Sequence, residues 1–281
     1  MGVIFVNCNS SIVALVSAML LMHGITPAHG EELWILSTGA LTKPLQNVAE
    51  SFCKRKDCEL VFNTFNSERA KRAVLYGLTE AHLVMLRSLK NVRELVQAGR
   101  VYPDYHVLCF SRWVIIVPEG NTKGITGIRD LGRTGVRIGV ASKVKGKVKP
   151  TAYQLPIEIA IAAGIKDAYL KNVVADFDCV RRVAEAVAKR TIDAAIVEER
   201  IAYEFKGKVK VIPIPMRYLL ASELYRDLSV FVVAVVKGTN REATAREMVN
   251  LLLSDDVQRL LARYGFIPVR AFEPHCFLKD E

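Results

Sequence analysis

The first strand-to-helix pattern in the chain is Trp34-Ile-Leu-Ser-Thr-Gly-Ala-Leu-Thr-Lys-Pro-Leu-Gln-Asn-Val-Ala-Glu-Ser-Phe52. An apolar run is followed by small residues at 37–40 and then by apolar residues at 41, 45, 48, 49 and 52, which share one face at a period of 3.6. The pattern predicts a strand, a turn and a helix, with Pro44 in the first helical turn, where a missing N–H costs nothing. Backbone N–H groups at a helix start favour an anion, so this turn is a candidate ligand site. The alternative is a turn that only connects a strand to a helix.

Length and charge limit the class of protein. The chain has 281 residues, 51% hydrophobic and 24% charged, enough for one large or two medium globular domains. Its formal net charge is +10, and residues 1–30 contain no Lys, Arg, Asp or Glu. A basic surface favours anionic partners. Lys and Arg are scattered along the sequence and no nucleic-acid-binding signature occurs, so we expect no nucleic-acid partner.

The N-terminal segment resembles an export signal. Residues 12–22 are apolar or small, about the length of a signal-peptide core and short for a membrane span. Small residues at 28 and 30 make cleavage after Gly30 plausible. We therefore expect residues 1–30 to be a signal peptide and the protein to be extracellular or periplasmic. An uncleaved membrane anchor and a buried strand are the alternatives.

Six cysteines occur, at positions 8, 53, 58, 109, 179 and 276. Cys53 and Cys58 could close a small disulfide loop outside the cell or stay as two thiols, because the spacing does not fix the geometry. The sequence has no C-x-x-C and no Cys/His cluster with zinc spacing. We therefore expect no metal site built by the protein alone and no cofactor.

Strands and helices are expected to alternate along the chain. Strand patterns cover 59–65 and 81–86, and helix patterns follow each of them. Such alternation predicts a mainly parallel sheet. Ser67 is expected to cap the helix after the second strand, with a ligand hydroxyl as the alternative role. Asp176 and Asp178 are expected to cap a later helix in the same way.

The chain is expected to cross between two lobes twice. The apolar stretch 107–117 is interrupted at Ser111-Arg112 and reads as a strand that leaves one lobe and enters another, and 228–236 reads as the return strand. This predicts one lobe from 31–112 plus 228–281 and a second lobe from 113–227, with a ligand cleft between them. Lys residues at 143, 145, 147 and 149 form either an anion-steering run or a solvated loop.

Five segments resemble the type II periplasmic-binding-protein superfamily, and most closely the molybdate/tungstate-binding components of ABC importers. The first two are Gly39-Ala-Leu-Thr-Lys-Pro-Leu45 and Asn66-Ser67, which resemble its anion-binding turns. The others are Phe110–Pro118, Pro150-Thr-Ala-Tyr153 and Leu251–Val269, which resemble the crossing strand, the turn of the second lobe and the closing helix with its Tyr-Gly-Phe-x-Pro end.

The resemblance implies a two-lobed α/β fold, each lobe a mostly parallel sheet flanked by helices, with the ligand cleft at the hinge. It implies an exported, monomeric solute-binding protein that captures a tetrahedral oxyanion, molybdate or tungstate first, and delivers it to a membrane permease. Such an anion needs hydrogen-bond donors, and each charge-assisted bond contributes ~1.5–3 kcal/mol. The site residues implied are Thr38, Gly39, Ala40, Ser67, Thr151, Ala152, Tyr153, Arg181 and Glu198.

Several positions depart from the family pattern. Ala40 replaces the first ligand serine, so only backbone N–H groups and nearby hydroxyls remain there. Thr151 and Ala152 replace an Ala/Cys-Gly pair. Glu198 falls where relatives carry a ligand Tyr or Glu, and its carboxylate would repel a dianion unless it joins the coordination of the metal or pairs with Lys149.

Three alternatives remain. The chain could bind a different small anion, or serve as a ligand-sensing module of the same fold. It could also be an enzyme with a cofactor held on a Cys, for which Cys109 and Cys179 are formal candidates. No Ser-His-Asp order, paired carboxylates or phosphate loop supports catalysis, so we expect a binding protein.

Overall fold

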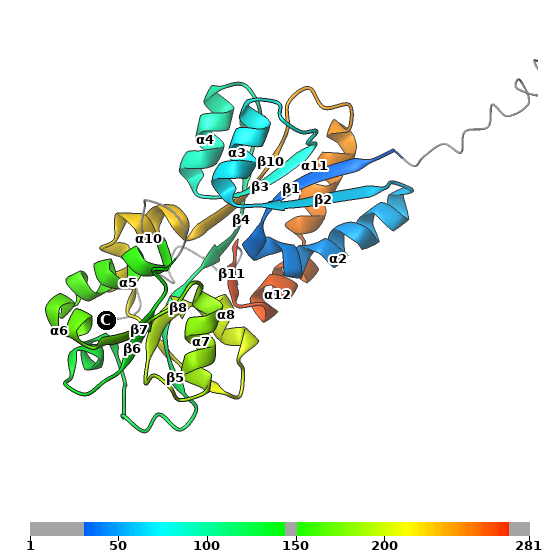
Figure 1. Cartoon of the computed structure of the whole chain (residues 1–281). Coiled ribbons are helices and arrows are strands. Elements are labelled where there is room, and N and C mark those ends of the chain that lie inside the picture. The colour runs from blue at the N-terminus through cyan, green and yellow to red at the C-terminus, as the bar shows by residue number, and fades with distance from the viewer. Residues whose placement is uncertain (1–30, 144–150, 270–281) are drawn as a thin grey trace, which may run out of the picture.

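The structure, a computed structural model, describes residues 31–143 and 151–269. Two α/β lobes are joined by the strands that run between them (Figure 1). The predictions for the signal segment 1–30 and for the lysines at 145, 147 and 149 lie outside the described residues. Within the described ranges, no helix is long and apolar enough to cross a membrane.

Lobe 1 is built on a six-stranded sheet in the order β11-β4-β10-β3-β1-β2. Strand β1 is parallel to β2 and β3, whereas β10 is antiparallel to β3 and β4, and β11 is antiparallel to β4. The strands are β1 (Leu33–Thr38), β2 (Leu60–Phe65), β3 (Leu83–Arg87), β4 (His106–Ser111), β10 (Val230–Val235) and β11 (Phe266–Pro268).

Five helices cover the two faces of this sheet. The strand alternation sends Ile35 to one face, with α2, α11 and α12, and Leu36 to the other, with α3 and α4. Both side chains are completely buried. The helices are α2 (Gly39–Lys56), α3 (Ser67–Leu75), α4 (Leu89–Gln97), α11 (Glu242–Leu252) and α12 (Asp255–Arg263).

Lobe 2 has an antiparallel sheet in the order β8-β5-β9 and a parallel pair, β6-β7. A parallel bridge from Ile138 to Ala194 connects the two. The strands are β5 (Trp113–Pro118), β6 (Ile138–Val140), β7 (Val173–Asp176), β8 (Ala195–Glu198) and β9 (Val209–Pro213). The helices are η1 (Ile128–Gly132), α5 (Thr151–Ala162), α6 (Lys166–Lys171), α7 (Val180–Ala188), α8 (Glu199–Glu204), α9 (Met216–Leu220) and α10 (Glu223–Leu228).

The predicted α/β fold with helices flanking the sheets is confirmed. The prediction that the strands of each sheet run mostly parallel is wrong. Apart from isolated bridges, parallel pairing in the described residues occurs between β1 and its two neighbours and between β6 and β7, strands that crossover helices connect. The crossing strands β4 and β5 and the return strand β10 pair antiparallel to their neighbours. They connect the lobes instead of belonging to a strand-helix-strand repeat.

The two crossing segments meet between the lobes. Strand β4 ends at Ser111 and β5 begins at Trp113, while β10 begins just after Ser229. The Ser111 N–H donates to the Ser229 carbonyl at 2.7 Å. The two connections therefore lie side by side, and the boundaries at 112/113 and 227/228 stay a prediction.

Two local predictions are wrong. Pro44 is the sixth residue of α2, not part of its first turn. It donates no hydrogen bond there, which leaves the Ala40 carbonyl without its helical partner. Helix α7 has Cys179 at its N-cap without a side-chain bond, so neither aspartate caps it. Asp176 instead accepts from the Ser142 N–H at 2.7 Å, and Asp178 pairs with Arg182 at 3.4 Å.

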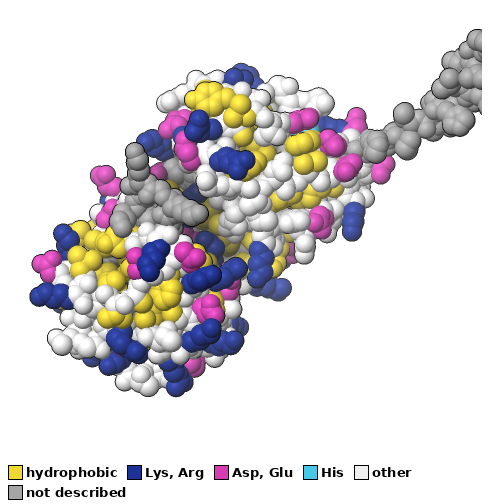
Figure 2. Space-filling model, in the orientation of Figure 1, with side chains coloured by type: hydrophobic (Ala, Val, Ile, Leu, Met, Phe, Trp, Pro, Cys, Tyr) yellow, Lys and Arg dark blue, Asp and Glu magenta, His cyan; other side chains and the backbone are white. Residues whose placement is uncertain are grey.

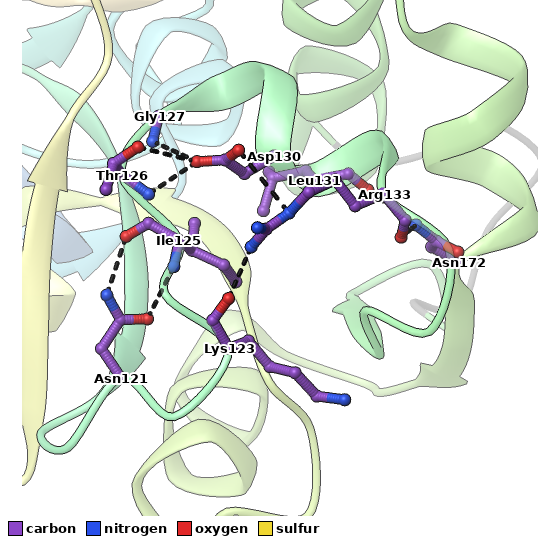
Figure 3. Close-up of polar contacts among 9 residues, drawn as sticks. All are labelled: Asn121, Lys123, Ile125, Thr126, Gly127, Asp130, Leu131, Arg133 and Asn172. Atoms are coloured by element: carbon purple, nitrogen blue, oxygen red, sulfur yellow. Dashed lines mark hydrogen bonds and ion pairs between the residues drawn. The ribbon is translucent and has the colours of Figure 1, made fainter.

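The loop between β5 and η1 is fixed by its own side chains (Figure 3). Asn121 accepts from the Ile125 N–H at 3.0 Å and donates to the Ile125 carbonyl at 2.8 Å. Asp130 accepts from the Thr126 and Gly127 N–H groups at 2.7 and 3.1 Å. The bond from Thr126 is the largest cause that lowers the pKa of Asp130. These polar groups satisfy each other and stabilise the loop rather than forming a site.

Candidate functional site

A pocket of about 220 Å³ lies between the lobes and is lined by both. Lobe 1 contributes the start of α2 and the turn from α12 to β11, and lobe 2 contributes α7 and α8. We call it the interlobe pocket; its lining residues are Gly39, Ala40, Lys43, Pro44, Arg181, Arg200, Tyr203, Glu204, Arg263, Tyr264 and Phe266. Figure 2 shows several Lys and Arg side chains gathered where the two lobes meet.

The start of α2 forms the lobe 1 wall for a local reason. Strand β1 ends at Thr38, whose extended backbone turns the chain into the helix, and the Thr38 side chain makes no capping hydrogen bond within the described residues. The first N–H groups of a helix have no intrahelical partner. Since Gly39 and Ala40 line the pocket, those N–H groups and the positive end of an 18-residue helix are available to an anion.

The pocket carries an excess of positive charge. Arg181 pairs with Glu204 at 2.7 Å, so those two charges cancel within the wall. Lys43 and Arg263 have no acidic partner among the described residues, and both line the pocket. Tyr203, Tyr264 and Phe266 provide aromatic surface beside these cations. The arrangement is suited to an anion that can also pack against these aromatic side chains.

The turn at Gly265 brings the lobes into backbone contact beside the pocket. Gly265 has φ +80, which favours glycine. A Cβ at this position would lie 2.7 Å from the Arg200 Cα and 2.8 Å from the Tyr203 ring. Glycine is therefore required twice, by the backbone conformation and by the close approach of α8.

Glu198 lies at the end of β8, and its carboxylate is engaged on both oxygens. Oε1 pairs with the Arg87 guanidinium at 2.5 Å, and Oε2 accepts from Nε of Arg200. Burial by itself would raise the pKa of Glu198, but the two guanidiniums outweigh burial and hold it below its ordinary value. Glu198 is therefore an ionised carboxylate with two arginine partners, not an unpaired one.

Arg87 and Arg200 are the partners that sequence reasoning missed. The sequence suggested Lys149 for Glu198, and that residue lies outside the described residues. One signal for Arg87 was present, because it directly follows the strand predicted at 81–86. It ends β3 at the same sheet edge as Thr38, where ligands of open α/β sheets bind.

Ser67 is not the helix cap, so that prediction is wrong. Asn66 is the N-cap of α3, and its side chain accepts from the Arg69 N–H at 2.8 Å. The Ser67 hydroxyl accepts from the Arg87 N–H at 2.9 Å. Its own proton has no acceptor among the described residues, so it can be donated to a ligand.

The predicted site residues are brought together only in part. Gly39, Ala40 and Arg181 line the interlobe pocket, and Thr38 directly precedes it. Glu198 and Ser67 are connected to it indirectly, through Arg200 and Arg87. Thr151, Ala152 and Tyr153 are the first described residues of α5, half-buried and outside the pocket lining. Their contact with a ligand stays a prediction.

The sequence of residues 33–267 matches the family model of the bacterial extracellular solute-binding proteins, and the chain belongs to that family. This family comprises proteins that bind a small solute outside the cytoplasm for uptake. No curated protein matches the sequence.

Solved structures share the fold. The substrate-binding domain of a putative molybdenum ABC transporter from Clostridium difficile has a TM-score of 0.68 at 19% identity, over 85% of this chain and 99% of that one. Iron-bound HitA from Pseudomonas aeruginosa has 0.61 at 14%, over 88% and 92%. PEB3 from Campylobacter jejuni, with bound L-phospholactate, has 0.59 at 17%, over 84% and 99%. At these identities the similarity shows the two-lobed type II fold and leaves the ligand open.

Proposed function

We propose that this protein captures a tetrahedral oxyanion in the interlobe pocket and delivers it to the permease of an ABC importer, with molybdate or tungstate as the first candidate. The observation that carries the proposal is the pocket wall, where the N-terminal end of α2 lies beside Lys43 and Arg263. Oriented N–H groups, together with cations that have no acidic partner in the described part of the chain, are the donors that an oxyanion requires. The similarity to the molybdenum transporter domain supports this choice.

The protein works by binding alone in this proposal. It is exported after removal of residues 1–30, acts as a monomer outside the cytoplasm, and needs neither a cofactor nor a metal of its own. The lobes close around the anion by bending at the two crossing segments, β4–β5 and α10–β10. A sensing role for the same fold is the alternative to transport.

A second candidate is an organic anion that carries a phosphate or a carboxylate. The observation that favours it is the aromatic surface of Tyr203, Tyr264 and Phe266 next to guanidinium groups. Guanidinium forks bind planar carboxylates and phosphates with two bonds, and rings cover a carbon skeleton. The phospholactate-bound relative is consistent with this class.

Isothermal titration calorimetry on the exported protein tests both candidates. The panel contains molybdate, tungstate, sulfate, phosphate and L-phospholactate, with ferric iron as a separate titration. We expect submicromolar binding of at least one oxyanion. Binding of phospholactate alone would select the second candidate, and heat from iron alone would overturn the proposal.

A further inference from the structure

One buried ion pair joins the two lobes. Arg87 lies at the end of β3 in lobe 1, and Glu198 lies at the end of β8 in lobe 2. The side chains are 17% and 6% exposed, and the Nη1–Oε1 distance is 2.5 Å. Breaking a buried pair leaves an uncompensated charge, which is costly, so this contact opposes separation of the lobes.

Arg87 is held in place by several contacts in the hinge region. Its Nη2 donates to Ser111 Oγ at 3.1 Å, its Nε donates to the Leu228 carbonyl, and its guanidinium lies 5.1 Å from the centre of the Phe231 ring. Ser111 ends β4 and Leu228 ends α10, so both lie in the segments that cross between lobes. The Nε and Nη2 groups of Arg87 are therefore held in the hinge region, and its Nη1 group pairs with Glu198.

The backbone beside Arg87 is strained. Ser88 has φ +84, which a non-glycine residue rarely adopts. Its N–H donates to the Val230 carbonyl at 2.9 Å, and its hydroxyl donates to Asp227. These two contacts with the return segment hold Ser88 in its strained conformation, next to Arg87 at the interface between the lobes.

Glu198 also connects this contact to the pocket. Its second carboxylate oxygen accepts from Nε of Arg200, and Arg200 lines the interlobe pocket. Glu198 itself is absent from the pocket lining. One buried carboxylate therefore holds a lobe 1 guanidinium and a pocket guanidinium at the same time.

We propose that Glu198 is a positioning residue that fixes the angle between the lobes through Arg87 and orients Arg200 toward the bound anion. The effect on affinity rests on the proposed function, whereas the effect on the lobes does not. Simple electrostatics makes the opposite prediction, because a nearby carboxylate repels an anion and its neutralisation would tighten binding.

The test compares Glu198→Gln with the matched control Glu185→Gln. Glu185 pairs with Lys189 on the solvent-facing side of helix α7, so its variant also loses one negative charge from lobe 2 without affecting the contact between lobes. We expect Glu198→Gln to give a larger radius of gyration by small-angle X-ray scattering of the ligand-free protein. We also expect the affinity for the anion that the wild type binds from the calorimetry panel to fall by roughly tenfold or more. Glu185→Gln should change neither.

Glu198→Asp keeps the charge but is one methylene shorter, so it cannot reach both guanidiniums. This variant should increase the radius of gyration as Glu198→Gln does. It also tests the proposal if the Gln variant does not fold. An unchanged radius of gyration in the folded variants, or tighter anion binding by Glu198→Gln, would overturn the proposal. If the wild type binds no anion of the panel, the proposed function fails, and the scattering comparison still decides the role of Glu198.

Discussion

Gly265 of lobe 1 lies directly against Arg200 of lobe 2, so closely that a Cβ on Gly265 would come within 2.7 Å of the Arg200 Cα. The same Arg200 lines the interlobe pocket and donates to Glu198. The turn after α12 and the start of α8 therefore set the width of the pocket at one end. Substitutions at Gly265, Lys43, Arg263 and Ser67 distinguish this contact from the other features of the site.

Gly265→Ala should weaken anion binding and destabilise the protein. The positive φ alone costs an L-residue ~1–2 kcal/mol, and the clash with Arg200 adds to it. Gly238→Ala is the matched control, because Gly238 has φ +78 but a Cβ there would meet no described atom within 4 Å. Thermal unfolding should show a loss for both variants, and calorimetry a loss of affinity for Gly265→Ala only. Equal affinities would mean that the close approach does not shape the pocket.

Lys43→Met and Arg263→Met should each lower anion affinity roughly two- to fivefold, since exposed charges interact by ~1 kcal/mol or less. The loss should shrink as salt is added, because these charges are exposed and screened. Lys54→Met, at the opposite end of α2, is the control. Calorimetry at two salt concentrations makes the comparison, and an effect of Lys54→Met as large as that of Lys43→Met would point to overall charge instead of the pocket.

Ser67→Ala and Asn66→Ala should differ in what they affect. Asn66 caps α3, so its loss should cost ~0.5–2 kcal/mol of stability and leave anion binding unchanged. Ser67 accepts from the Arg87 N–H and has a proton to donate, so its loss should weaken binding by ~1–3 kcal/mol as well as removing one internal bond. Urea unfolding and calorimetry on both variants give the comparison. A Ser67→Ala variant with normal affinity would restrict Ser67 to a structural role.

Stability should fall in acid partly because of Glu198. Burial alone would raise the pKa of Glu198, but in the folded protein the two guanidiniums outweigh burial and hold that pKa below its ordinary value. A carboxyl whose folded pKa is lower than its unfolded one contributes stability above the unfolded value, and that contribution disappears as the pH falls through the folded value. Urea unfolding between pH 7 and acid should therefore show a smaller pH dependence for Glu198→Gln than for the wild type. The same slope in both proteins would exclude this contribution.

Much of the fold follows from local patterns in the sequence. The apolar periodicity of 34–52 predicts β1 and α2, and the interruption at Ser111-Arg112 marks the passage between lobes. These features can be recognised locally, because the period of apolar side chains and the interruption of an apolar run depend only on neighbouring residues. Strand direction could not be predicted in the same way. It depends on where the return strand β10 inserts between β3 and β4.

Patterns in the sequence are enough to predict a two-lobed solute-binding fold and a helix that starts at Gly39-Ala40. Three relationships become visible only in the folded chain: Glu198 pairs with Arg87 and Arg200, Asn66 and not Ser67 caps α3, and Gly265 lies against Arg200. Two of these three relationships join segments far apart in the chain. In the third, either of two adjacent residues, Asn66 or Ser67, can cap α3. The Ser67 hydroxyl instead accepts from the Arg87 N–H at the end of β3. Such pairings are fixed by how the lobes pack, because a local pattern does not specify which distant charge or backbone group a residue will meet.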